Sequence, residues 1–312
     1  MIKFYESRKI YFIVSLGLFL VGFIGFLING VSLDIQFKGG SILKYSYTQA
    51  VDKDKAAEVA TKTLNKRVDA QETENLIKKT KNLVLNVAGG TGISAQDQEK
   101  LDAALKDNFK DAGLALSESN NVEPFIGKRF FRNGLLAIGF ASLIILAYVW
   151  YRFKRIDSLS LGVMALVALL HDVLMVLVTF IVFRIPLNDA FIAVVLTIIG
   201  YSMNDTIVIY DRIRENARMM KPNTPVEVLV NTSISQSLAR SLNTSLATFA
   251  AISIVYIFSA IYNIESIRNF ALPMMVGVIS GSYSTICIAG PLWVMWQKRK
   301  EKKELEVKKA KA

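Results

Sequence analysis

A carboxylate lies inside an apolar stretch of this chain. The run from Ala190 to Tyr210 contains Asn204 and Asp205, and at about 1.5 Å per residue it can cross the roughly 30 Å hydrocarbon core of a bilayer. A charge near the centre of a membrane helix costs about 2.5–3.5 kcal/mol, so such residues usually face the bundle and mark an ion or proton path. Asp205, with Asn204 beside it, is therefore the first candidate for a proton or ion relay.

Arg240 is the predicted partner of Asp205. It belongs to a stripe of polar and small residues at helical spacing on the next apolar helix, formed by Gln236, Arg240, Asn243, Thr244, Ala247 and Ala251. Both residues are expected near the same side of the membrane, hence at similar depth. The pair could be a static ion pair that stabilises packing. We favour the relay, because ionisable groups inside membranes are usually functional.

A second cluster consists of His171 and Asp172, within "ALVALLHDVLMVLV". Both lie near the middle of an apolar run, and histidine titrates near neutral pH, which suits a relay. Hydrogen bonding across helices explains the pair equally well, so both interpretations stay open. Gly277 and Gly281 are spaced four residues apart, which predicts close packing of one helix on another.

No enzyme is expected from these residues. The chain has one cysteine, Cys287, and one histidine, His171, so neither a disulfide framework nor a cysteine-based metal site is predicted. No nucleophile and base can be paired. We expect no metal and no cofactor besides a coupling ion, and a lone carboxylate suits H⁺ or Na⁺ alike.

The hydropathy pattern predicts a polytopic α-helical membrane protein. Of the residues 52% are hydrophobic, and six runs are long enough to span a bilayer: about 10–29, 134–151, 160–183, 189–210, 242–262 and 270–296. Lys and Arg cluster before the first run, after the second and fourth, and in the tail. Positive charge stays inside, so both termini are predicted to be cytoplasmic and residues 30–127 extracytoplasmic.

The chain divides into four parts on this basis. Residues 1–29 are the N-terminus and first span, and residues 30–127 form an α+β domain with the order βαββαβ, a ferredoxin-like sandwich. Residues 128–296 hold the other five spans, with a cytoplasmic loop and surface helix over 211–241 that Thr224 caps. Residues 297–312 are a basic tail, which fits an anchor near anionic lipid better than a nucleic-acid contact.

Four motifs resemble the SecF proteins of the bacterial SecD/SecF protein-export family, which belongs to the RND superfamily. They are "GYSMNDTIVIYDRIREN", "SLARSLNTS", "ALLHDV" and "IRNFALPMMVGVISGSYSTICIAGP". The resemblance implies a multi-pass protein of the bacterial inner membrane that works with SecD. Together they would assist preprotein translocation through SecYEG, using the proton gradient. It also implies that Asp205 and Arg240 are tied to proton movement.

One motif departs from the family. "DIQFKGG" places Gln36 where the family usually has an acid, although Gly39 and Gly40 still supply a tight turn. Two alternatives stay open beside protein export: an RND-type half-transporter for a small molecule or lipid, and a scaffold in which Asp205 and Arg240 form a structural pair.

Overall fold

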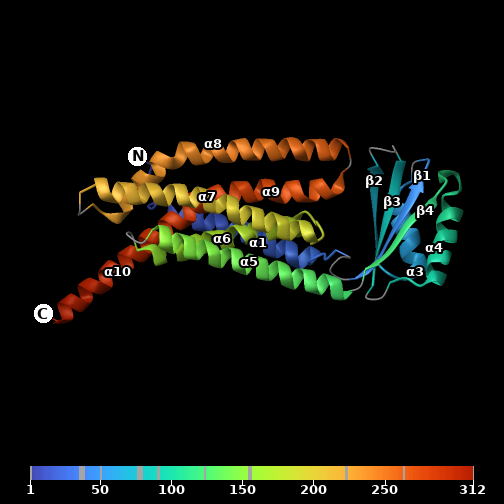
Figure 1. Ribbon diagram of the computed structural model, residues 1–312, viewed down its shortest axis with the longest axis horizontal. Helices are drawn as coiled ribbons and strands as arrows, with labels where there is room; N and C mark the ends of the chain where they lie inside the picture. Colours follow the sequence, from blue (N-terminus) through green and yellow to red (C-terminus); the bar gives the residue numbers. More distant parts are fainter. Residues whose placement is uncertain are drawn as a thin grey trace.

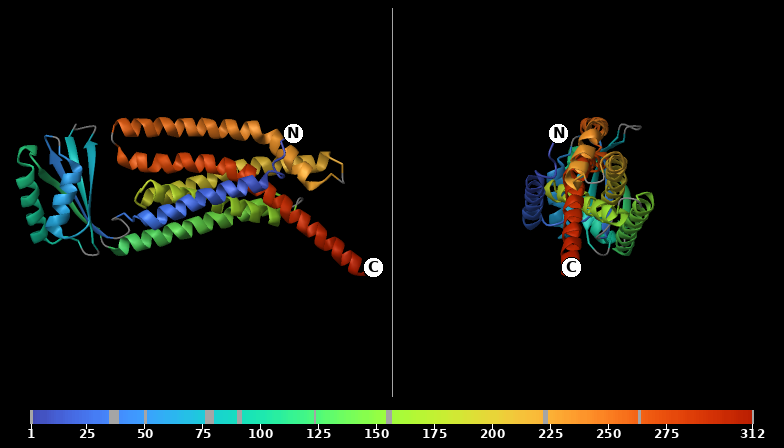
Figure 2. Two further views of the ribbon diagram at one scale, coloured as in Figure 1. Left: turned by 180° about the vertical axis from the view of Figure 1, so that it is seen from behind. Right: turned by 90° about the vertical axis from the view of Figure 1, so that its left-hand side faces the viewer.

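The computed structural model consists of a long helical bundle with a small α+β domain at one end (Figure 1). It describes residues 2–34, 39–49, 51–75, 80–89, 92–122, 124–153, 157–221, 224–262 and 264–311. Both ends of the chain lie at the end of the bundle away from the α+β domain (Figures 1 and 2). This placement agrees with an even number of spans.

Six segments are long and apolar enough to cross a membrane, which confirms the six predicted spans. The helices of the bundle are α1 (Arg8–Asn29), α5 (Pro124–Arg152), α6 (Ser158–Val182), α7 (Asp189–Met219), α8 (Val226–Ile261) and α9 (Glu265–Ser284). A π-helical segment, η2 (Thr285–Ala289), joins α9 to α10 (Gly290–Lys311). The chain is therefore a multi-pass α-helical membrane protein.

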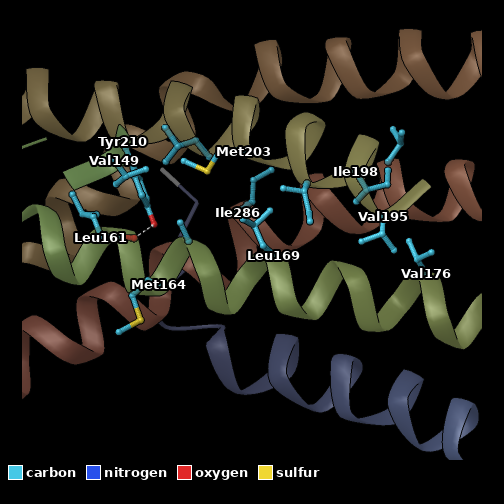
Figure 3. Packing of buried hydrophobic residues seen from close by; sticks show 14 of the residues in the cluster. Val149, Leu161, Met164, Leu169, Val176, Val195, Ile198, Met203, Tyr210 and Ile286 are labelled. Carbon is cyan, nitrogen blue, oxygen red and sulfur yellow. Dashed lines mark hydrogen bonds between the residues drawn. The ribbon is translucent and has the colours of Figure 1, made fainter. Parts of the chain in front are cut away.

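Helices α6, α7 and α9 form the centre of the bundle, and α1, α5 and α8 lie outside it. The central helices bury about half or more of their most apolar windows, whereas the outer three are largely exposed. Val176, Val195 and Ile198 fill the contact between α6 and α7 (Figure 3). Nearer the termini, Tyr210 Oη donates a 3.0 Å hydrogen bond to Leu161 O. The apolar core thus encloses the stretch of α7 that carries Asp205.

The predicted surface helix is not a separate element. Helix α7 continues past Tyr210 to Met219, and α8 runs unbroken from Val226 to Ile261. Neither glycine nor proline occurs within α8, so nothing ends the helix before it enters the membrane. The capping prediction was also wrong: Thr224 Oγ1 donates to Lys221 O, and Pro225 occupies the N-cap position without a side-chain bond.

The α+β domain has a four-stranded antiparallel sheet in the order β2-β3-β1-β4. Its elements are β1 (Gly40–Tyr47), α3 (Lys53–Leu64), β2 (Val68–Asn75), β3 (Thr80–Ala88), α4 (Ala95–Asn108), the short 3₁₀-helix η1 (Lys110–Ala112) and β4 (Ala115–Val122). Alternate residues of β3, among them Leu83 and Leu85, are fully buried in a core shared with α3 and α4. Ser94 accepts a hydrogen bond from the Asp97 amide and caps α4 as predicted.

The segment after α1 joins the domain to the bundle. Leu187, between α6 and α7, donates from its amide to Ser32 O at 2.8 Å and accepts from the Asp34 amide at 3.0 Å. Gly40 has φ of +151°, and a Cβ there would meet Val87 O at 2.2 Å, so the start of β1 requires glycine. Gln36 lies outside the described residues.

Candidate ion-relay site in the helical bundle

Asp172 on α6 is the centre of a buried polar cluster that gathers several helices. Its side chain has no exposed surface. Ser202 of α7 and Ser284 of α9 donate to Oδ2 at 2.7 Å and 2.8 Å, and Ser280 of α9 donates to Oδ1 at 2.7 Å. Hydrogen bonds from three hydroxyl groups offset the free-energy cost of removing this carboxylate from water. Asp172 therefore ties α6 to both of its central neighbours.

His171 extends this cluster to the first helix. Its Nδ1 lies 3.3 Å from Asp172 Oδ1, and its Nε2 lies 3.2 Å from Ser15 Oγ on α1. Ser15 in turn reaches Tyr283 Oη at 3.3 Å, and Tyr283 donates to Tyr11 O at 2.6 Å. Because the single hydroxyl hydrogen of Ser15 goes to Tyr283, its oxygen is left to accept from Nε2–H of His171.

Asp205 lies one turn further along α7 than Ser202 and has fewer hydrogen-bond partners than Asp172. It is 7% exposed, and its Oδ2 has no hydrogen-bond partner among the described residues. Ser241 of α8 is the side chain that interacts with this carboxylate, and among the described residues its buried hydroxyl has no partner at hydrogen-bonding distance either. A buried carboxylate oxygen without a hydrogen-bond partner costs free energy, which distinguishes Asp205 from the fully bonded Asp172.

Arg240 is not paired with Asp205, contrary to the prediction. Its side chain is exposed and lines a polar cavity of about 620 Å³ with Arg212, Arg218 and Gln236. Within the described part of the chain, no ion pair joins Arg240 to an acidic residue. Neighbouring residues on a helix point about 100° apart. Because Ser241 takes the direction toward Asp205, Arg240 is turned out of the bundle.

Asn204 is also directed away from the buried cluster. It is exposed on α7, whereas Asp205 and Ser202 face inward. The structure therefore separates Asn204, Asp205 and Arg240, which the sequence places in one relay.

Gly277 and Gly281 set the distance between α9 and α7. A Cβ at Gly277 would come within 2.6 Å of the Ile198 side chain, and one at Gly281 within 3.1 Å of Ser202 Cβ. This close approach allows Ser280 and Ser284 to reach Asp172 from the flanking turns. The packing role and the polar cluster thus depend on the same segment of α9.

The sequence reasoning missed the serine and threonine partners. Ser280 and Ser284 are spaced four residues apart on either side of Gly281, and this spacing is the signal in the sequence that could have found them. Thr206 and Thr285 lie 2.9 Å apart, and Tyr201 donates to Ser245, which is bonded to Ser282. These contacts adjoin the π-helical turns of η2, and such turns occur frequently at functional sites.

The arrangement can carry a proton or present oxygen ligands to a small cation. Asp172 and its three hydroxyls offer only oxygen atoms, and His171 offers a titratable nitrogen beside them. In the parts of the chain that the structure describes, no three His, Cys, Asp or Glu residues gather as a metal cluster.

Comparison with known proteins identifies the family of this bundle. The family described as protein export membrane protein SecD/SecF, C-terminal, matches residues 101–299. The chain belongs to the SecD/SecF family. It is similar to the protein translocase subunit SecF of Alicyclobacillus acidocaldarius, with 34% identity over 98% of this chain and 96% of that protein.

Other members of the SecD/SecF family join this unit to a longer chain. The protein translocase subunit SecDF of Bacillus subtilis is 32% identical over 96% of this chain, which covers 39% of that protein. The crystal structure of SecDF from Thermus thermophilus, described as a translocon-associated membrane protein, has a TM-score of 0.77 and 27% identity. That match covers 95% of this chain and 39% of the solved chain.

Proposed function

We propose that this protein is a SecF-like subunit of the Sec export machinery, which uses an ion gradient to promote preprotein translocation. The observation that carries the proposal is Asp205, a buried carboxyl with an unpaired oxygen in a membrane helix. It occurs in a chain that matches translocase SecF subunits over nearly its full length. An ionisable side chain inside the membrane costs free energy, and such residues usually serve a function such as proton transfer.

In this proposal the position of Arg240 differs between the two protonation states of Asp205. In the structure Arg240 lines the polar cavity, and we assign this arrangement to the state in which Asp205 is protonated. Loss of the proton leaves a buried anion that attracts the guanidinium, and this requires movement of α8 against α7. One charge that crosses the membrane field yields about 2.3 kcal/mol per 100 mV, which is enough to bias such a movement. Asn204 lies beside this path on the exposed face of α7.

His171 and Asp172 form a secondary relay in this proposal. Their cluster connects α1, α6, α7 and α9 through side-chain hydrogen bonds. Helix α1 leads directly into the α+β domain through the contact at Leu187. A change of charge in the cluster can therefore be transmitted to the domain.

The orientation follows from the positive charges at the termini. We assign both termini to the cytoplasm of the bacterial inner membrane and the βαββαβ, ferredoxin-like domain to its outer side. There the domain meets the emerging preprotein, and the complex includes SecD and SecYEG. The SecDF proteins that contain both parts in one chain support the association with SecD. The coupling ion is H⁺ or Na⁺.

Preprotein translocation into inverted membrane vesicles tests this function. We compare the wild type with Asp205→Asn at equal complex levels, with and without an ion gradient. Stimulation by the gradient in the wild type alone assigns coupling to Asp205. Equal stimulation of both proteins contradicts the relay, and equal translocation with and without the whole complex contradicts the export function itself.

A further inference from the structure

A groove between α6 and α10 combines apolar walls with a basic rim. Helix α10 leaves the bundle at the end away from the α+β domain (Figures 1 and 2). The groove beside it has a volume of about 710 Å³. The apolar walls come from the first turns of α6 and the middle of α10: Leu159, Val163, Met164 and Trp296. The rim consists of Arg299, Lys300, Lys302 and Lys303, with Asp157 and Glu306.

The apolar walls are open to the surroundings. Leu159 is 61% exposed, Val163 41% and Trp296 49%. Leu159 and Val163 lie at the start of the membrane-spanning segment Leu159–Val182, and Trp296 is the last apolar residue before the polar tail that begins at Gln297. Tryptophan favours this boundary between hydrocarbon and headgroups. The floor of the groove is therefore at the depth of the upper acyl chains.

Two cations of the rim have no acidic partner among the residues that the structure describes. Lys300 pairs with Asp157 at 3.2 Å and Lys302 with Glu306 at 3.9 Å. Arg299 and Lys303 make no ion pair with any described residue. They are four residues apart and share a face of α10 with Trp296. Two uncompensated positive charges thus lie one to two turns beyond the apolar walls, where lipid phosphates are found.

We propose that this groove binds an anionic phospholipid, with an acyl chain against Val163 and Trp296 and its phosphate between Arg299 and Lys303. Basic pockets beside membrane helices favour such headgroups. A free phosphate would satisfy the cations but leave the apolar walls without a neighbour. A zwitterionic lipid would cover the walls but carry no net charge to the rim. The anionic phospholipid matches both parts.

Tryptophan quenching by brominated lipid tests the site in the full-length chain. The protein has three tryptophans, Trp150, Trp293 and Trp296, so a Trp150→Phe background leaves only the two on α10. Nanodiscs of zwitterionic lipid receive a small fraction of brominated phosphatidylglycerol or, separately, brominated phosphatidylcholine. Each basic group contributes about fivefold to binding of an anionic headgroup. We therefore expect half-maximal quenching by brominated phosphatidylglycerol at a mole fraction at least about fivefold lower than that needed with brominated phosphatidylcholine.

Matched variants connect this preference to the rim. Arg299→Gln with Lys303→Gln should weaken the preference by about 25-fold at most and remove it at high salt. Lys308→Gln with Lys309→Gln removes the same charge from exposed positions of α10 outside the groove and should leave the preference unchanged. Equal quenching by the two brominated lipids in the wild type overturns the proposal. So does relief of quenching by millimolar glycerol phosphate, which would indicate a site for a free phosphate.

Discussion

Ser202 Oγ donates a 2.7 Å hydrogen bond to Asp172 Oδ2, so a central helix that carries Asp205 is bonded to the helix that carries His171. Ser202 also lies against Gly281, whose missing side chain allows α9 to come close. The two acidic residues of the bundle interior are thereby linked through one serine and one turn of α7. This linkage makes separate tests of the two acidic residues necessary.

Asp172→Leu should destabilise the protein strongly. The substitution leaves three serine hydroxyls and His171 facing an apolar side chain, and removal of one partner from a buried ionic cluster costs about 3–5 kcal/mol. Thermal unfolding of the full chain in detergent measures the loss. Asp189→Ala, at an exposed position at the start of α7, serves as the control and should change stability much less. Similar melting temperatures for the two variants would contradict the bonding role of Asp172.

Gly281→Val should separate α9 from α7. A Cβ at this position already meets Ser202 Cβ at 3.1 Å, and overpacking of a helix contact costs about 1–3 kcal/mol. Thermal unfolding and gradient-stimulated translocation should both decline. Gly139→Val on α5 adds the same atoms where no neighbour lies within 4 Å, and should be tolerated. If Gly139→Val is as harmful as Gly281→Val, close packing is not the reason for glycine at position 281.

Arg240→Gln should remove stimulation by the gradient and leave stability nearly unchanged. The side chain is exposed and makes no ion pair with a described residue, so its loss removes little from the folded state. Translocation assays with and without a gradient, together with melting curves, separate the two effects. Arg218→Gln removes a charge from the same cavity and is the control. A large fall in melting temperature for Arg240→Gln would point to a structural pair instead.

Asp157 should make the attachment of α10 to α6 sensitive to acid. Burial by itself raises the pKa of Asp157, but bonds from Gln297 and Lys300 and the charge of Lys300 outweigh it and hold the pKa below its ordinary value of 3.8. Because the pKa is lower in the folded state, the ionised carboxylate stabilises the fold at pH values above about 3.8. This stabilisation is lost as the pH falls from about 3.8 through the lower pKa of the folded state. Asp157→Asn should therefore be less stable than wild type near neutral pH.

Melting curves at several pH values measure this contribution. The difference between wild type and Asp157→Asn should vanish in the acidic window below about pH 3.8. Glu301→Gln, at an exposed position on α10, should show no such convergence. A difference that persists into acid would mean that the carboxylate charge is not what attaches α10.

Much of the fold follows from local patterns in the sequence. Six apolar runs predict six spans, because a bilayer selects helices by length and hydropathy. The alternation of Leu83 and Leu85 predicts the buried face of β3, and Ser94 predicts the start of α4, since both depend on near neighbours. In the region 211–241, residues 226–241 are helical, but they are continuous with the fifth span across the change from polar to apolar residues and do not form a separate surface helix. A helix without glycine or proline continues across such a change.

The site divides in the same way. That Asp205, His171, Asp172 and Arg240 lie in or beside the membrane follows from the sequence, because hydropathy and the cost of burying a charge depend on composition. The packing of the helices, by contrast, brings serines from α1, α7 and α9 to His171 and Asp172 and turns Arg240 away from Asp205. The physical reason is helix rotation: which residue of a turn faces which neighbour is set by side-chain packing among all the helices.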